Sequence, residues 1–168
     1  VLLHEIGHAL GLKHPFEADR ANSSTLNAYE DQTEFTAMSY ELVPFTFTGM
    51  FRPLDWMTLT KFYGVNSEYR PDDDVYTFDD KSAVFIIDGN GLDAINSPNS
   101  TQNIFLDLRQ GGHSYEGQKS TYITAAKQLT ISHGSNIENV QTGSGNDTVI
   151  GNDLPNIINS GDGDDVIF

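Results

Sequence analysis

The feature that most constrains the fold is a nine-residue period near the end of the chain. It runs through three consecutive stretches: TGSGNDTVI (142–150), GNDLPNIIN (151–159) and SGDGDDVIF (160–168). The eighth position is always a large aliphatic residue, namely Val149, Ile158 and Ile167. Each period places a Gly/Asn/Asp turn before a short apolar segment. The pattern therefore predicts short strands that are joined by tight loops and stacked in successive coils.

The loops of this pattern carry oxygen atoms that suit a hard cation. Their glycines permit a tight turn with inward carbonyl groups, and the sixth position adds a carboxylate. If each nonapeptide forms half a coil of a β-roll, the loop 142–147 faces the loop 160–165. We expect calcium between them, with these ligand residues: Gly143, Gly145, Asp147, Gly161, Gly163 and Asp165. The middle loop has Asn156 at the sixth position, and its candidate ligands are Asn152 and Asp153. The strict register argues against the alternative, a flexible acidic tail.

The composition disfavours several functional classes. The 168-residue chain has nine basic and 24 acidic residues and a net charge of −15, which disfavours binding to nucleic acid or anionic membranes. It contains no cysteine, which excludes disulfides, thiolate metal sites and cysteine catalysis. Its longest apolar runs are too short to span a bilayer, so we expect no membrane insertion.

Hydrophobic periodicity and turn residues divide the chain into a helical part and a β-rich part. We expect helices at 1–12 and 54–63, with a polar surface loop at 16–37 between them. Further along, β-branched and aromatic clusters alternate with turns, which predicts strands at 75–78, 83–87, 104–108, 122–125 and 129–132. We therefore place a domain boundary at about residue 66, which gives the domains 1–66 and 67–168.

The stretch HEIGHALGLKH near the start has the residue types and spacing of a metal site. On a helix, His4 and His8 share one face, where two imidazoles can bind a single ion. Gly11 allows the chain to turn back, so that His14 supplies a third ligand. Glu5 lies beside His4 and can reach a metal-bound water as a general base. Three neutral ligands leave one position for that water, whose pKa zinc lowers to about 7.

This HExxHxxGxxH motif resembles the signature of the metzincin metallopeptidases. Metzincins also have a downstream turn that contains a methionine, and TAMSY at 36–40 is similar to the turn of the serralysin branch. By this resemblance, Met38 forms an apolar floor beneath the zinc ion. Tyr40 is implied to lie near the metal, as a further zinc ligand that can swing away to stabilise the oxyanion. The remaining histidines, His113 and His133, lie among Gly and Ser without ligand spacing, and we expect them in solvated loops.

The same resemblance implies a calcium site at the start of the β-rich part. In serralysins such an ion joins two loops, which here correspond to 69–76 and 87–95. The resemblance implies carboxylate ligands from Asp74, Asp88 and Asp93, and carbonyl ligands from Arg70, Asp72 and Asn90. Asp72 stands where the family pattern has glycine, and the alternative interpretation is a pair of solvated turns.

Together, the motifs imply an α+β chain. Its first part resembles the C-terminal part of a metzincin zinc-protease domain, mostly helix and loop. An all-β parallel β-roll with calcium-binding loops follows. Because the zinc motif starts at residue 4 and the repeats run to residue 168, we expect a fragment. Such a fragment would lack the N-terminal half of the protease domain and the end of the roll.

The implied activity is zinc-dependent endopeptidase hydrolysis of protein substrates, with one catalytic zinc ion and several structural calcium ions. Glu5 would act as the base, and Tyr40 would stabilise the oxyanion. The resemblance also implies export by bacterial type I secretion machinery to an extracellular location, and we expect a monomer. The alternative is an RTX-type calcium-binding module for secretion or adhesion that carries an inactive protease remnant. The intact set of three histidines and Glu5 favours the enzyme, because a binding module has no need of a general base.

Overall fold

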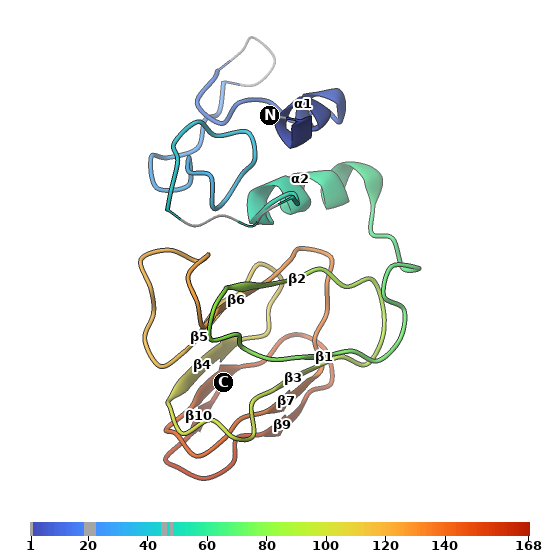
Figure 1. The fold of residues 1–168 in the computed structure, drawn as a ribbon. Helices are drawn as coiled ribbons and strands as arrows, with labels where there is room; N and C mark the ends of the chain where they lie inside the picture. The colour runs from blue at the N-terminus through green and yellow to red at the C-terminus, as the bar shows by residue number, and fades with distance from the viewer. Residues whose placement is uncertain (1, 19–22, 45–46, 48) are drawn as a thin grey trace. The chain divides into compact units, whose positions relative to one another are not determined.

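The computed structural model describes residues 2–18, 23–44, 47 and 49–168. The chain divides into two compact units, Val1–Gly64 and Val65–Phe168, so the break lies close to the expected boundary at residue 66. The helices belong to the first unit and the strands to the second (Figure 1). No helix among the described residues has the length and apolar character needed to cross a membrane.

Each helix is followed within two residues by a glycine with a positive φ angle. Helix α1 (Leu2–Ala9) is shorter than the expected 1–12, of which residue 1 lies outside the described residues, and Gly11 follows it with φ of +91°. Helix α2 (Pro53–Tyr63) starts one residue earlier than expected, because proline fits the first helical position, where no N–H donor is needed. Its end is closed by Gly64, which has φ of +80° and donates its N–H to the Thr60 carbonyl at 2.9 Å.

The first unit has a small apolar core. It consists of Leu12, Met38 and Leu59, with Leu10 and Phe51 packed against them. The described part of the expected surface loop 16–37 has no helix or strand, but its end is not on the surface. Four of its residues are buried, namely Thr33, Glu34, Thr36 and Ala37. Polar composition predicted exposure here, whereas the buried polar groups are accommodated by hydrogen bonds such as that of Thr36 to Asp55.

The second unit is built from two sheets that enclose one apolar core. The first sheet is parallel, in the order β1 (Val75–Tyr76), β3 (Ala94–Asn96), β7 (Asn139–Gln141) and β9 (Ile157–Asn159). The second sheet has the order β10 (Val166–Ile167), β8 (Thr148–Ile150), β4 (Ile104–Asp107), β5 (His113–Glu116), β6 (Gln128–Ile131) and β2 (Val84–Ile86). Both sheets contribute to the core, which is formed by Tyr76, Phe78, Ile86, Ile95, Ile104, Leu106, Leu108, Leu129, Ile131, Ile137, Val140 and Val149.

The strand pairing follows the nine-residue period. Thr148 pairs with Val166 in one sheet, and Asn139 pairs with Ile157 in the other, which is an offset of 18 residues in both cases. Two nonapeptides therefore make one full coil, and loops that are two periods apart lie against each other. The predominance of strands and this register are consistent with the expected β-roll region.

Two expectations for this unit are wrong. The roll is not entirely parallel, because β5 runs antiparallel to both β4 and β6. A tight turn, in which the Gly112 N–H donates to the Arg109 carbonyl at 2.7 Å, reverses the chain after β4. The segment expected as a strand at 122–125 forms turns instead, with Ile123 and Thr124 buried. Its apolar side chain enters the interior from a turn, so residue type alone misled the assignment.

His113 is also not the solvated loop residue that its neighbours suggested. It lies on β5 and is half-buried, with Nδ1 at 3.0 Å from Thr130 Oγ1 and Nε2 at 3.2 Å from Gln128 Oε1. Burial lowers the pKa of His113, so the neutral ring is favoured. His133 lies on a turn, as expected.

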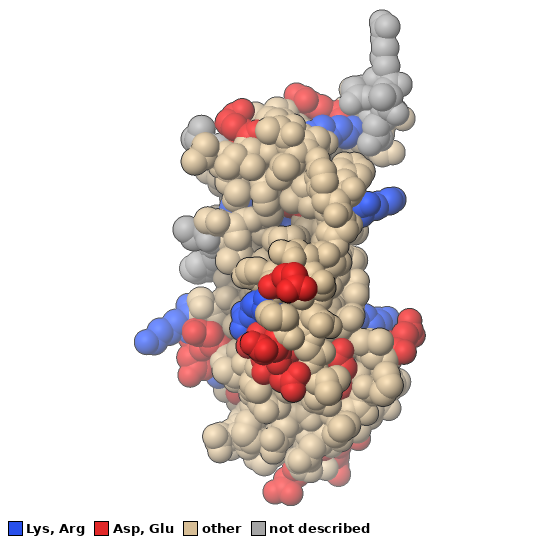
Figure 2. Space-filling model, turned by 90° about the vertical axis from the view of Figure 1, so that its right-hand side faces the viewer, with Lys and Arg blue, Asp and Glu red and all other residues tan. Residues whose placement is uncertain are grey.

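On the face that Figure 2 shows, the acidic side chains form several separate groups rather than one patch, and some of them lie beside Lys or Arg. Other carboxylates are buried, among them Asp55, Asp88, Asp93, Asp107, Glu138 and Asp147. A buried ionised group is costly unless it is paired or hydrogen-bonded, so the partners of these carboxylates are informative.

Candidate metal centre

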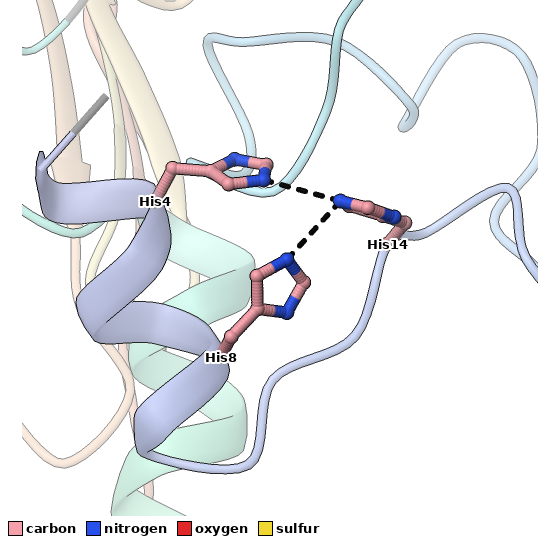
Figure 3. A group of neighbouring side chains, drawn as sticks. All are labelled: His4, His8 and His14. Carbon is pink, nitrogen blue, oxygen red and sulfur yellow. Dashed lines mark hydrogen bonds between the residues drawn. The ribbon is translucent and has the colours of Figure 1, made fainter.

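Three histidines of the first unit converge on one point (Figure 3). His4 and His8 project from the same face of α1, and His14 approaches from the segment after Gly11. The Nε2 atom of His14 lies 3.1 Å from Nε2 of His4 and 3.1 Å from Nε2 of His8. Within the part of the chain that the structure describes, these residues form a potential metal-binding group whose ligand atoms all lie within 4.8 Å.

Backbone carbonyl groups set the tautomers of two of these rings. Nδ1 of His4 donates to the Ala37 carbonyl at 2.9 Å, and Nδ1 of His8 donates to the Leu12 carbonyl at 3.0 Å. A carbonyl oxygen can only accept, so each Nδ1 carries the hydrogen, and a neutral ring then presents a lone pair at Nε2. The lone pairs on Nε2 of His4 and His8 are thus available beside His14 Nε2, which lies 3.1 Å from each of them. The arrangement therefore fits a zinc ion bound by three imidazoles.

Aromatic and acidic groups surround His14. The Tyr40 hydroxyl lies 2.9 Å from His14 Nε2, although the residue is 61% exposed, so this side chain reaches the metal group from the surface. The ring of Phe16 stacks on His14, with centroids 5.1 Å apart. The Glu17 carboxylate lies 3.1 Å from His14 Nδ1, within ion-pair distance but without hydrogen-bond alignment.

Glu5 and Met38 occupy contrasting environments. Glu5 lies on α1 next to His4, and its side chain is exposed to solvent. Met38 is only 1% exposed and packs against the helix backbone: a Cβ added to Gly7 would lie 2.5 Å from Met38 Sδ. The methionine therefore supports the turn of α1 between His4 and His8.

The two loops implied to share a calcium ion lie together in the second unit. Asp93 Oδ1 accepts the Asp74 N–H at 2.8 Å, and Leu92 donates its N–H to Asp73 Oδ1 at 2.9 Å. Asp88 is buried beside them, and its Oδ1 accepts the Asn90 N–H at 3.2 Å. Asp72 is exposed within the first loop.

Electrostatics favour a cation at this junction. Burial raises the pKa of Asp93 to about 6, and the neighbouring carboxylates of Asp88, Glu138 and Asp74 add to the effect. The Arg70 side chain already supplies one positive charge, because its Nε lies 2.8 Å from Asp74 Oδ2 and 4.0 Å from Asp88 Oδ2. One guanidinium does not balance these four carboxylates, so the surplus of negative charge fits a hard cation.

The loops 142–147 and 160–165 stack closely. The Gly143 carbonyl accepts the Asp162 N–H at 3.0 Å, and Asp165 Oδ1 accepts the Asp147 N–H at 2.8 Å. A Cβ on Gly161 would clash with the Gly143 carbonyl, and one on Gly163 would clash with the Gly145 carbonyl. Glycine is therefore required here for close approach of the two loops.

Asp147 has a carboxylate oxygen without a partner. The residue is 1% exposed, and its Oδ1 accepts the Ile104 N–H at 2.7 Å. Its Oδ2 atom is buried and has no hydrogen-bond partner. An unpaired anionic oxygen inside a loop stack is costly, and a calcium ion would satisfy it.

One part of this stack escaped the sequence analysis. The loop 99–104 packs against 142–147, so that Ser144 donates its N–H to the Ser100 carbonyl at 2.9 Å. This loop lacks the Gly/Asp spacing of the repeats, so period alone could not reveal it. The period does place the middle loop against 137–139, and Asn139 pairs with Ile157 in the parallel sheet. Glu138 Oε2 accepts the Asp93 N–H at 2.9 Å.

Asn152 makes hydrogen bonds that join the two sides of the roll. Its Nδ2 donates to the Ile137 carbonyl at 2.8 Å and to the Leu108 carbonyl at 3.2 Å. Its Oδ1 accepts from Leu154 N and Asn156 Nδ2, both at 3.0 Å. Asp153 is exposed in the same loop.

Comparison with known proteins adds an independent observation. No protein-family model matches the chain. A serralysin from Photorhabdus laumondii is 33% identical over 182 aligned positions, which cover 92% of this chain and 37% of that protein. Serralysin B from Dickeya chrysanthemi is 37% identical over 88% of this chain and 35% of its own length. Metalloprotease AprA from Pseudomonas entomophila is 32% identical over 94% of this chain and 37% of its own length.

The fold and the histidine group thus belong to a chain that is related to metalloproteases. Within that class it is a serralysin-type sequence, which confirms the resemblance inferred from the motifs. The chain spans 35 to 37% of the length of these three relatives.

Proposed function

We propose that this chain carries the zinc-binding and catalytic residues of a secreted metalloendopeptidase that hydrolyses proteins. The observation that carries the proposal is that His14 Nε2 lies 3.1 Å from Nε2 of both His4 and His8, and that the Nδ1–H of each of these two rings is held by a carbonyl. His4, His8 and His14 would hold one zinc ion. The relationship to serralysins supports the same assignment.

Glu5 and Tyr40 perform the proton transfer and the charge stabilisation. When bound, zinc lowers the pKa of water and polarises the substrate carbonyl. The exposed Glu5 carboxylate accepts a proton from the attacking water and then delivers it to the departing amine. The Tyr40 hydroxyl, which lies at the histidine group, donates a hydrogen bond to the carbonyl oxygen as negative charge develops there.

Calcium would stabilise the second unit at two places. At the first junction, the proposed ligands are the carboxylates of Asp74, Asp88 and Asp93 and the carbonyls of Arg70, Asp72 and Asn90. In the repeat stack they come from Gly143, Gly145, Asp147, Gly161, Gly163 and Asp165, and Asn152 and Asp153 are further candidates. The buried, unpaired Oδ2 of Asp147 supports the second site. Such a roll would fold only where calcium is plentiful, which suits export of the unfolded chain through a type I system. We expect the exported protein to be a monomer.

The test uses the full-length protein, with zinc analysis and casein hydrolysis for the wild type, Glu5→Gln and Glu41→Gln. We expect all three proteins to bind zinc, and only Glu5→Gln to lose hydrolysis, because Glu41 is an exposed carboxylate of the same unit. A wild type without zinc would refute the metal site. Undiminished hydrolysis by Glu5→Gln would refute the proposed base. Zinc binding without hydrolysis by the wild type would favour the calcium-binding module with an inactive remnant.

A further inference from the structure

Asp55 is a buried carboxylate on α2 to which the sequence motifs assign no role. It is 2% exposed and accepts three hydrogen bonds. Its Oδ1 accepts from Thr36 Oγ1 at 2.6 Å, and its Oδ2 accepts from the N–H groups of Ala37 at 2.7 Å and Arg52 at 2.9 Å. Burial raises the pKa of Asp55, and these donors oppose that shift. Two of its three partners belong to the turn that contains Met38.

The turn connects Asp55 to a histidine of the metal group. The Ala37 carbonyl accepts the Nδ1–H of His4 at 2.9 Å. The Met38 N–H, which lies in the same peptide plane as that carbonyl, donates to Thr36 Oγ1 at 3.0 Å. Thr36 Oγ1 in turn donates to Asp55. Asp55 therefore fixes the direction of the Ala37 carbonyl through Thr36 and the Met38 N–H. That carbonyl in turn accepts the hydrogen bond of His4.

We propose that Asp55 is a positioning residue for the metal centre, which orients His4 through the backbone of the turn 36–38. The inference rests on the zinc site proposed above. A ring whose Nδ1–H is held by a fixed acceptor keeps both its tautomer and its orientation, so its Nε2 is ready to bind metal. Asp55 touches neither the ring nor the metal position, and it acts only through Thr36 and the Ala37 peptide groups.

His8 provides an internal control for this connection. Its Nδ1 donates to the Leu12 carbonyl at 3.0 Å, in the segment that follows its own helix. No hydrogen bond of the described residues leads from Asp55 to that carbonyl. Asp55 should therefore be coupled energetically to His4 and not to His8.

The experiment measures zinc dissociation constants of the full-length protein at fixed pH by competition with a chromophoric chelator. Asp55→Ala should raise the constant about tenfold, which is the lower end of the loss seen when a support of a metal ligand is removed. Asp55→Asn should lose less, because its amide oxygen can still accept from Ala37. The control on the same helix is Thr60→Val, which removes only bonds to the helix carbonyls of Trp56 and Met57 and should leave the constant unchanged.

A double-mutant cycle separates positioning from general loss of stability. In a His4→Ala background, Asp55→Ala should cause no further loss of zinc affinity. In a His8→Ala background, it should again cause a loss of about tenfold. The visible absorption spectrum of the cobalt-substituted protein should change in Asp55→Ala and be restored in Asp55→Asn. Circular dichroism identifies variants that fail to fold. If Asp55→Ala is among them, Thr36→Val replaces it in the cycle, because it removes the hydroxyl that joins the Met38 N–H to Asp55.

Failure of this inference is distinguishable from failure of the zinc site. Unchanged zinc affinity in Asp55→Ala, or equal losses in both histidine backgrounds, would overturn the positioning role while the site itself stands. If the wild type binds no zinc, or if the His4→Ala variant binds zinc as tightly as the wild type, both the site and the inference are overturned.

Discussion

The unpaired oxygen of Asp147 leads to a prediction whose sign depends on calcium. The change is Asp147→Asn, which keeps the shape of the side chain and the acceptor for the Ile104 N–H. It removes the charge and places an amide where the buried, unpartnered Oδ2 now lies. In the calcium-free protein, the substitution therefore removes a buried unpaired charge that is destabilising. In the calcium-bound protein, it removes a calcium ligand that is stabilising.

The two effects have different magnitudes. An unsatisfied buried polar group costs about 1–3 kcal/mol, so the calcium-free variant should be no less stable than the wild type, and up to about 1 kcal/mol more stable. If loss of one charged ligand weakens calcium binding about 100-fold, the variant should lose about 2.7 kcal/mol of unfolding free energy under saturating calcium. The sign of the change should thus reverse when calcium is added.

The assay is urea unfolding of the wild type and the variant, with excess calcium and with a calcium chelator. Asp162→Asn is the control, because it makes the same charge change at an exposed position of the facing loop and should behave like the wild type in both conditions. Equal destabilisation by Asp147→Asn with and without calcium would show that Asp147 is not a ligand and that its role is purely structural.

Two further predictions concern the other buried groups. In calcium-free protein, the raised pKa of Asp93 means that its protonated form is favoured by folding. Its stabilising contribution should be complete below about pH 4 and be lost as the pH rises through about 6, on the order of 1–2 kcal/mol after solvent screening. Urea unfolding between pH 4 and 7 should show this decline in the wild type and not in Asp93→Asn; identical slopes would contradict it. Gly7→Ala should destabilise the first unit by about 1–3 kcal/mol, because Met38 Sδ lies 2.5 Å from the new Cβ. Helix propensity alone predicts a gain of about 1 kcal/mol, so a more stable variant in thermal unfolding would refute the tight packing.

The errors of the sequence analysis share a physical cause. The segment 122–125 has the residue types of a strand, but it delivers its apolar side chain to the core from a turn. His113 is flanked by glycine and serine, yet its ring is hydrogen-bonded to the side chains of Thr130 and Gln128 on the neighbouring strand β6. In both places long-range packing decided the outcome, and a local window contains no information about the partner.

The convergence of the three histidines was predictable for the opposite reason. His4 and His8 face the same way because of helix geometry, and Gly11 brings the chain back within a few residues. The 18-residue offset of the stacked loops likewise follows from a period that is visible in the letters of 142–168. In each case a local conformation, repeated or regular, converts spacing in the sequence into spacing in space.

The sequence by itself thus predicted the convergence of the three histidines, the register of the repeats and the relationship to serralysins. Only the tertiary structure decided that His4 is bound to the Ala37 carbonyl, that the loop 99–104 stacks on 142–147, and that Asp55 on α2 supports the turn at Met38. These contacts join segments 18 or more residues apart, for example Asp55 with Ala37, and Asp147 with Ile104. No periodicity relates such pairs, because they are brought together by the packing of whole elements around a core.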